Sequence, residues 1–209
     1  MMNTWLLLSL LLLAQYGSAP TPNQSSDAGS SAQTPAYTAD GKLLLPAKYR
    51  EWVYLSSGID MSYFNNGMAM DHSMFDNVFV NPDAYRSFLE TGKWPDKTML
   101  VLEVRKAGSN ASINKSGHFQ TGELMGREVH VRDDSRFDGR WAFFGFDDAT
   151  TAKVVPKEAA CYSCHQQHGA VDTTFVQFYP TLIEIAKSKG TLSAEYLKEE
   201  ATAQKQGDK

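Results

Sequence analysis

The sequence predicts an α+β fold, in which an antiparallel β-sheet is flanked by helices. Segments with strand character follow one another between residues 77 and 146, and turn residues separate them. Helical signals lie between and beyond these segments, most clearly after residue 160. No internal repeat is visible along the 209 residues.

The first elements are expected as follows. Tyr49–Leu55 lies near a short helix that opens the domain. Asn77–Val80 is expected to be a strand that stops before Pro82, because proline cannot donate to a β-ladder. A second helix is expected over Asp83–Thr91, and the aliphatic run Thr98–Val104 after it predicts another strand.

Two more strands are predicted further along the chain. Apolar and polar residues alternate in Arg127–Arg132, which places Glu128 and His130 on one face and two valines on the other. Periodicity alone turns that polar face toward solvent. The aromatic run Trp141–Phe146 is the next strand, with turn-forming pairs on both sides.

The most informative motif covers residues 161–165 and reads C-x-x-C-H, the attachment sequence of a c-type haem. Two thiols reach the vinyl groups on one edge of the porphyrin, and the adjacent histidine supplies an axial nitrogen to the iron. The chain has two cysteines in all, so neither is left for a structural disulfide. We therefore predict one covalently attached haem c per chain, held by Cys161, Cys164 and His165, with His165 as the metal ligand.

Two other kinds of site could contain the paired cysteines. A zinc site would need further ligands, but the histidines of this chain lack finger-like spacing. A thioredoxin-like redox pair would sit in a βαβ unit, and no such pattern surrounds the motif. Both are weaker than the haem interpretation.

A helix is expected after the motif, with Asp172 or Thr173 as its cap. Pro180 should kink this helix or shift its start. Apolar residues recur there at three- and four-residue spacing, namely Phe175, Phe178, Tyr179, Leu182 and Ala186. The haem is expected between the sheet and this C-terminal helix, rather than inside a four-helix bundle.

The two ends of the chain differ from the core. Residues 5–14 form an apolar run too short to span a bilayer, so residues 1–19 are interpreted as a signal peptide. Residues 20–37 have the composition of a disordered linker, and residues 191–209 that of a charged tail forming a solvated helix. Residues 38–190 remain as one haem domain. We expect a periplasmic or otherwise exported protein without a membrane anchor after cleavage, and the formal net charge of -4 argues against nucleic-acid binding.

Three separated segments resemble the cytochrome P-460 family, in the family's order: Leu43–Val53, Gly139–Phe146 and Cys161–Leu182. The similarity spans about residues 43–187. The resemblance implies a periplasmic mono-haem protein that is mostly antiparallel β and often homodimeric. Some members oxidise hydroxylamine, and a related branch, the cytochromes c′-beta, binds nitric oxide and carbon monoxide at an open iron.

The resemblance also assigns pocket residues. Hydroxylamine-oxidising members carry a lysine cross-linked to the porphyrin, and that position falls on Leu102, while Lys97 and Lys106 lie outside the strand. A pocket arginine falls on Asp76, whereas the acidic pocket residue is kept as Glu128. The chain therefore looks closer to the c′-beta-like members, with Leu102 against the haem and Glu128 as the candidate catalytic residue.

Several side chains are candidates for the distal side of the haem. His168 cannot reach it from the helix that carries His165, so a hydrogen bond or solvent exposure is expected. The other histidines are expected to be ordinary surface or hydrogen-bonded ones: His72, His118 and His130. An aliphatic wall is expected from Leu100, Leu102 and Val104, and an aromatic cap from Phe119, Phe143, Phe144 or Phe146. A sixth ligand would come from Met61, Met68, Met70, Met74, Met99 or Met125, none of which is singled out by its spacing.

The expected function is binding of nitric oxide or a similar small diatomic or nitrogenous ligand at an open distal iron, with redox turnover left open. One alternative is a hydroxylamine or nitric oxide oxidoreductase in which Glu128 accepts protons. Another is an electron-transfer cytochrome with a sixth protein ligand. A redox partner protein and a homodimer are expected by analogy with the family.

Overall fold

A computed structural model of the chain describes residues 34–62, 73–147 and 149–207. The expected signal peptide and most of the expected linker lie outside these ranges, as do His72, Met68 and Met70. Within them, no helix combines the length and apolar character that crossing a membrane requires.

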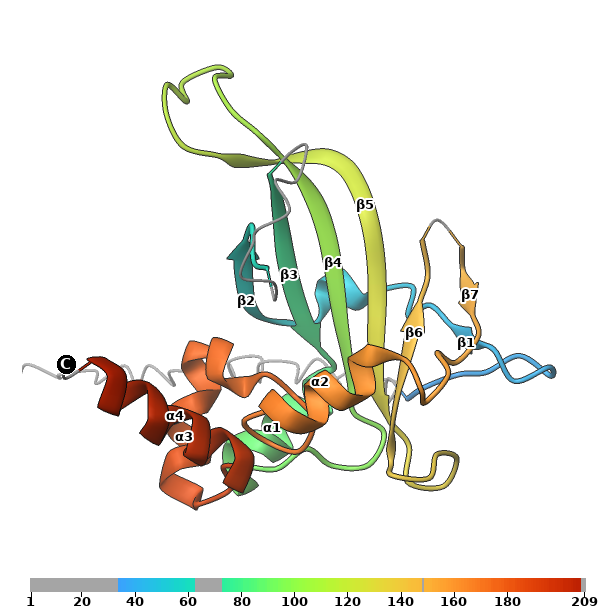
Figure 1. The fold of residues 1–209 in the computed structure, drawn as a ribbon. Coiled ribbons are helices and arrows are strands. Elements are labelled where there is room, and N and C mark those ends of the chain that lie inside the picture. Colours follow the sequence, from blue (N-terminus) through green and yellow to red (C-terminus); the bar gives the residue numbers. More distant parts are fainter. Residues whose placement is uncertain (1–33, 63–72, 148, 208–209) are drawn as a thin grey trace, which may run out of the picture. The chain divides into compact units, whose positions relative to one another are not determined.

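The centre of the fold is a five-stranded antiparallel sheet in which each strand pairs with its neighbour in sequence (Figure 1). The strands are β2 (Val53–Ile59), β3 (Met74–Val80), β4 (Met99–Gly108), β5 (Phe119–Arg132) and β6 (Trp141–Gly145). The predicted α+β class and antiparallel sheet are confirmed. Two strands that the sequence analysis did not identify, β1 (Leu43–Leu44) and β7 (Thr151–Ala152), form a second small sheet.

The start of the domain is less helical than its sequence suggested. The short helix is a single 3₁₀ turn, η1 (Tyr49–Glu51), and β2 begins two residues later. Val53 pairs with Val80 of β3, and Leu55 is buried. Pairing with β3 therefore decides the conformation of this segment. The hydrogen bonds and side-chain packing gained by pairing outweigh its weak local preference.

Four α-helices complete the fold: α1 (Pro82–Thr91), α2 (Ala160–His168), α3 (Pro180–Lys189) and α4 (Ala194–Gly207), with a 3₁₀ turn, η2 (Val176–Phe178), before α3. Pro180 is the first residue of α3, so it sets the start of that helix instead of kinking it. The expected cap at Asp172 or Thr173 was wrong, since Tyr179 precedes the helix. Asp172 instead adopts a φ of 52° in the turn between α2 and η2.

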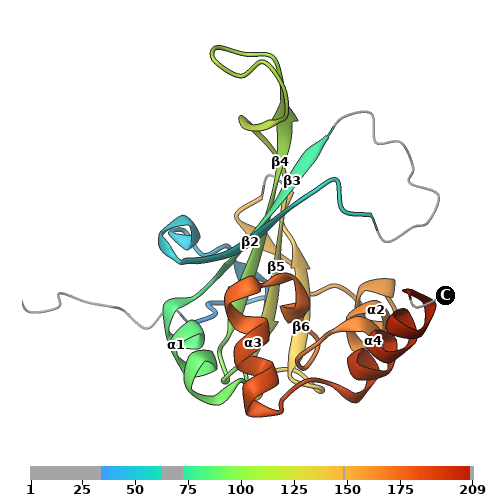
Figure 2. The same ribbon diagram turned by 90° about the vertical axis from the view of Figure 1, so that its left-hand side faces the viewer.

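The sheet has two differently covered faces. On one, Leu100 and Val80 join a core that α1 and α3 cover with Phe88 and Leu182. Figure 2 shows α1 and α3 side by side at one end of the strands, with α2 and α4 beside them. On the other face, a second core includes Val101, Val129, Val131 and Phe144 and is closed by Leu43 and Trp52. The face that packs on the helices is the one that bears the candidate site.

Candidate haem site

The C-x-x-C-H motif lies within α2, as expected for a segment that opens the helical region. Cys161 and Cys164 are free thiols, both half-buried and one helical turn apart. Burial raises the pKa of the Cys164 thiol, and the nearby Cys161 and Glu199 raise it further. The Cys164 thiol is thus held in its protonated form.

Tyr162, between the two cysteines, attaches α2 to the sheet. Its hydroxyl donates to the carbonyl of Val155 at 3.0 Å, and the backbone N–H of Phe143 on β6 lies 3.4 Å from the same oxygen. The Tyr162 and Phe143 rings meet edge to face at 4.9 Å. These contacts fix where the motif stands relative to the sheet.

The imidazole of His165 has a defined hydrogen-bonding state. Its Nδ1 lies 2.7 Å from the backbone carbonyl oxygen of Thr173. A carbonyl only accepts, so Nδ1 carries the hydrogen and Nε2 is left with its lone pair. Burial lowers the pKa of His165 although the Thr173 carbonyl opposes this, so the ring is neutral at neutral pH. A neutral imidazole with one nitrogen fixed by a carbonyl is the form in which histidine binds a metal.

The ring of His165 is also held by aromatic neighbours. It stacks on Phe175 at 4.1 Å and meets Phe143 edge to face at 4.6 Å. The loop that supplies the Thr173 carbonyl is itself fixed, because the Trp94 indole donates to the Thr174 hydroxyl at 2.8 Å in the core. The imidazole is therefore oriented before any cofactor arrives.

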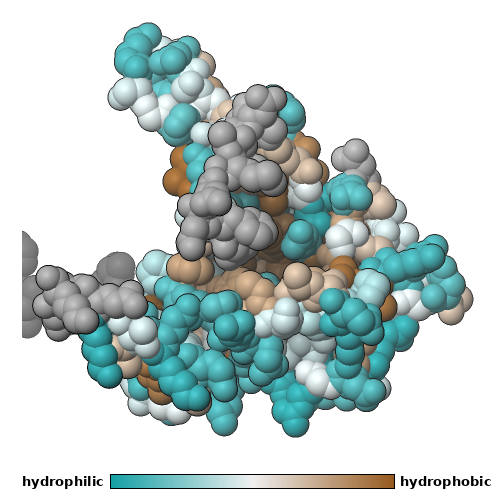
Figure 3. All heavy atoms as spheres, in the orientation of Figure 1, coloured by the Kyte–Doolittle hydropathy of each residue, from teal (hydrophilic) through white to brown (hydrophobic). Residues whose placement is uncertain are grey.

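Beside α2, the sheet presents apolar side chains that the core does not cover. Leu102 of β4 lies opposite Val78 of β3 on one side and Glu128 of β5 on the other, and Val104 lies opposite Asp76. The three aliphatic side chains are only half-buried, whereas Leu100, one pair closer to the helices, is 4% exposed. Figure 3 shows hydrophobic surface in the corner between the sheet and the helical layer. A flat apolar macrocycle would bury this surface.

These residues fit a haem. Two thiols one turn apart, a neutral imidazole with an available Nε2 and an adjoining aliphatic sheet surface are the groups that a c-type haem requires. The zinc alternative gains no support, because among the described side chains no three His, Cys, Asp or Glu come close enough together to hold a metal ion.

Two carboxylates share the sheet face with Leu102. The Glu128 side chain is exposed, yet partial burial by the surrounding protein raises its pKa, and Asp147 raises it further. The pKa of Asp76 is raised by burial and by repulsion from Asp60 and Glu128. Glu128 therefore lies on the same sheet face as Leu102, and it is close enough to Asp76 to raise the pKa of that carboxyl.

The structure places the expected distal aromatic residues elsewhere. Phe143 contacts His165, so it lies on the side of the predicted iron ligand. Phe144 and Phe146 are buried in the core on the opposite face of the sheet, and Phe119 packs near Gly108 in the β4–β5 hairpin. The expected aromatic cap was therefore wrong for these four residues, because strand alternation turns neighbouring aromatic side chains to opposite faces.

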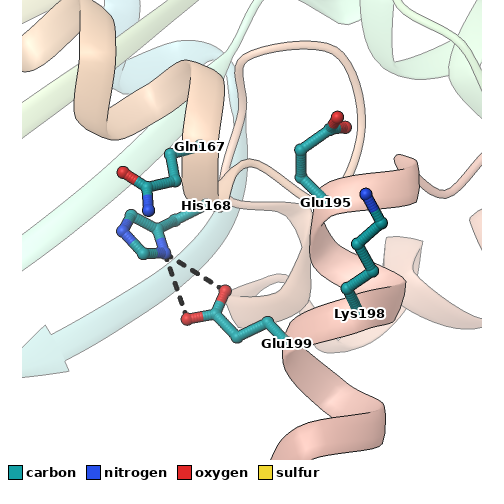
Figure 4. A pocket seen from close by; sticks show the side chains of 5 residues that line it. All are labelled: Gln167, His168, Glu195, Lys198 and Glu199. Carbon is teal, nitrogen blue, oxygen red and sulfur yellow. Dashed lines mark hydrogen bonds and ion pairs between the residues drawn. The ribbon is translucent and has the colours of Figure 1, made fainter.

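The described histidines outside the motif have separate roles. His118 is exposed in the hairpin, as expected. His130 is 8% exposed and its ring centroid lies 5.1 Å from that of His165, so it is neither a solvent-facing nor a distal residue. His168 binds Glu199 of α4 through Nδ1 at 3.0 Å, which confirms the hydrogen bond expected for it. Figure 4 shows this pair in a shallow pocket between α2 and α4, whose other lining side chains are Gln167, Glu195 and Lys198. Its charged lining suits solvent and not a macrocycle.

The methionines considered as a sixth ligand lie at different places in the sheet. Met99 is buried on the face away from the helices, and Met61 is exposed. Met74 shares the face of Leu102 but lies four residue pairs further from the helices, opposite Lys106. Lys106 binds Glu123 at 3.1 Å.

Sequence reasoning missed the partners of the iron ligand. The sequence predicted only a helix cap for Thr173 and no role for Tyr162. Neither role carries a sequence signal, because each depends on a contact that the folded loop and sheet create.

The comparisons with known proteins agree with this geometry. A family model described as Cytochrome P460 matches residues 46–176, which include the sheet, α1, α2 and the Thr173 loop. No curated protein matches the chain significantly.

Proposed function

The chain belongs to the cytochrome P460 family and is a haem c-type cytochrome, and we propose that it binds nitric oxide or a similar small ligand at an open distal iron site. Cys161 and Cys164 hold the macrocycle through two thioether bonds, each formed by addition of S–H across a vinyl group. His165 holds the iron from one side through Nε2. The bound group supplies an iron that takes up small diatomic or nitrogenous ligands and exchanges one electron.

The observation that carries this proposal is the aliphatic character of the sheet face beside α2. Val78, Leu102 and Val104 offer neither a hydrogen-bond donor nor a coordinating atom. A polar guest next to such side chains loses hydrogen bonds to water without replacement, whereas a neutral diatomic molecule loses little. Leu102 also stands where the cross-linking lysine of hydroxylamine-oxidising members is expected, and leucine cannot form that bond.

Hydroxylamine oxidation is the second candidate function, and Glu128 is the observation that favours it. Its raised pKa suits a proton acceptor on the same face as Leu102. In this reading, electrons from hydroxylamine pass to an external acceptor while Glu128 takes a proton. A simple electron carrier is the third candidate function, and Met74 is a methionine on that face that could serve it.

Optical spectra of the purified protein, ferric and then reduced, test the proposal. We expect a high-spin ferric spectrum, an ordinary c-type reduced spectrum, and saturable binding of nitric oxide to the reduced protein. A low-spin spectrum that becomes high-spin in Met74→Leu would identify an electron carrier instead. A strongly red-shifted main band with hydroxylamine turnover that Glu128→Gln abolishes would establish the oxidase reading.

Export is a further part of the proposal, and it rests on the apolar run of residues 5–14 and on the haem motif. We propose that the mature protein is periplasmic and carries one haem. The intact mass of protein from a periplasmic extract tests this. It should equal the chain without its first 19 or so residues plus one haem, and an unprocessed mass from the cytoplasm would contradict it.

A further inference from the structure

His130 occupies an unusual place for a polar side chain. It is paired with Leu100 of β4 and Phe143 of β6 in the middle of the sheet, where a hydrophobic side chain would pack without desolvation cost. Its ring stacks on Phe143 at 4.0 Å, with an interplanar angle of 12°, and lies 4.4 Å from the Trp141 ring. An imidazole buried there is expected to have a polar partner.

The partner of His130 leads to the iron ligand. Its Nε2 lies 3.3 Å from the hydroxyl oxygen of Thr173, and the carbonyl oxygen of the same Thr173 accepts the Nδ1 hydrogen of His165 at 2.7 Å. One residue thus joins the two histidines, through its side chain on one side and its backbone on the other.

The other contacts of this loop are made by the neighbours of Thr173. Val171 and Thr174 pair with each other across the turn, with the Thr174 N–H donating to the Val171 carbonyl at 3.0 Å. Trp94 fixes Thr174 from the core side. Asp172, next to Thr173, has a φ of 52°, and its carboxylate forms an ion pair with Arg132 at 3.5 Å. That contact holds the Asp172 side chain and not the Thr173 carbonyl.

We propose that His130 is a positioning residue for the iron ligand: through the Thr173 hydroxyl it holds the Thr173 carbonyl against His165 and so sets the donor strength of His165 toward the haem iron. The inference rests on the proposed function only in that haem iron binds His165. A hydrogen bond from the far nitrogen makes a metal-bound imidazole a stronger donor, and a stronger donor stabilises ferric iron over ferrous.

The direction of the effect follows from this chain of contacts. Without the hydroxyl link, the Thr173 carbonyl is less well placed and His165 becomes a weaker donor. The reduction potential should then rise, and the iron–histidine stretching frequency of the ferrous protein should fall. We expect a shift of about tenfold in the one-electron equilibrium toward the ferrous form, which is about 59 mV.

The test uses the haem-loaded, full-length protein with three variants at the link. Thr173→Val keeps the shape of the side chain and the backbone carbonyl but removes the hydroxyl. Thr173→Ser keeps the hydroxyl. His130→Phe keeps a ring against Phe143 and removes the nitrogen. His168→Gln, on α2 itself but bonded to Glu199, is the matched control. The readouts are the reduction potential and the ferrous iron–histidine stretching band, with haem content measured in each sample.

We expect Thr173→Val and His130→Phe to raise the potential by similar amounts, and the double variant to raise it no further than either single one. Thr173→Ser and His168→Gln should match the wild type. If Thr173→Val lowers stability but has the potential and stretching band of Thr173→Ser, the role of His130 is structural and the inference is overturned. If His130→Phe does not load haem, the comparison of Thr173→Val with Thr173→Ser still tests whether the hydroxyl link affects the reduction potential.

Failure of the proposed function would look different. A wild-type protein that attaches no haem, or in which His165 does not ligate the iron, overturns both proposals. A wild-type protein with a normal five-coordinate haem and unchanged potentials in the variants overturns only the positioning role of His130.

Discussion

Leu102 of β4 and Glu128 of β5 are direct partners across the sheet, and both lie on the face that carries the core beneath α1 and α3. Since paired residues on adjacent strands stand about 5 Å apart, an aliphatic and an acidic side chain adjoin on the surface that we assign to the haem. The register of these two strands therefore decides the chemistry available there.

The absence of a lysine at residue 102 predicts that the haem is attached through the cysteines alone. Tryptic digestion of the loaded protein should yield haem on the peptide with Cys161 and Cys164. The peptide Thr98–Arg105, which contains Leu102, should be unmodified in mass spectrometry. Haem on a longer peptide that contains Lys97 or Lys106 without cleavage after it would show that a lysine outside the expected position forms the bond.

The environment of Glu128 predicts a pH-dependent stability difference. Its folded pKa is raised above the ordinary 4.5, so Glu128 costs stability once pH rises past 4.5, and fully so above its folded pKa. Glu128→Gln removes that cost. It should gain less than about 1 kcal/mol at pH 8, because the exposed side chain is screened by solvent, and almost nothing at pH 4.

Urea unfolding of the haem-free chain at pH 4, 6 and 8 measures this gain. Asp76→Asn is the companion variant, because the pKa of Asp76 is raised by burial and by Glu128 itself. It should show the same sign and pH direction. A gain that is equal at all three values of pH would contradict the assigned shift.

Glu103, on the opposite face of the sheet, predicts the reverse dependence. Burial alone would raise the pKa of this carboxylate, but hydrogen bonds from Arg105, Tyr49 and Arg50 outweigh it and lower the pKa below 4.5. The stabilisation is therefore present above pH 4.5 and lost as pH falls through the folded pKa. Glu103→Gln should cost about 3 kcal/mol at pH 7 and less at acidic pH.

The control for Glu103 is Glu51, an exposed carboxylate 3.6 Å from Lys48. Glu51→Gln should change the free energy of unfolding by no more than about 0.5 kcal/mol. If both substitutions cost the same, the buried network around Glu103 does not stabilise the fold as described.

Gly169 predicts a steric requirement at the end of α2. A Cβ at this position would lie 2.7 Å from the His165 carbonyl oxygen, 2.9 Å from the Thr174 nitrogen and 3.0 Å from the Thr173 carbonyl carbon. All three are backbone atoms, so the loop itself must move. Gly169→Ala should destabilise the haem-free chain by about 1–3 kcal/mol.

Gly122→Ala provides the comparison, because a Cβ there meets no atom within 4 Å. Urea denaturation of both variants measures the difference. Equal stability of the two would show that the Thr173 loop accommodates a side chain at Gly169 without strain.

Much of the fold could be predicted because its signals are local. An aliphatic run located most of β4, an aromatic run located β6, and alternation located the end of β5. Pro82 and Pro180 stand where α1 and α3 begin. Local sequence patterns did not predict segments whose conformation depends on pairing with another strand. Val53–Ile59 has no strong strand pattern and becomes β2 through its register with β3.

The predicted attachment motif is recognisable in the sequence alone, because two thiols and an imidazole within five residues come together on one helix. What surrounds that helix follows from the tertiary fold. It placed His130 beside His165 instead of in solvent, Phe144 on the far face, and the Thr173 carbonyl on the imidazole. These contacts depend on strand register and join residues that lie far apart in the chain. His165 and Thr173 are eight residues apart, and His130 and Thr173 are 43 apart, so no local sequence pattern predicts them.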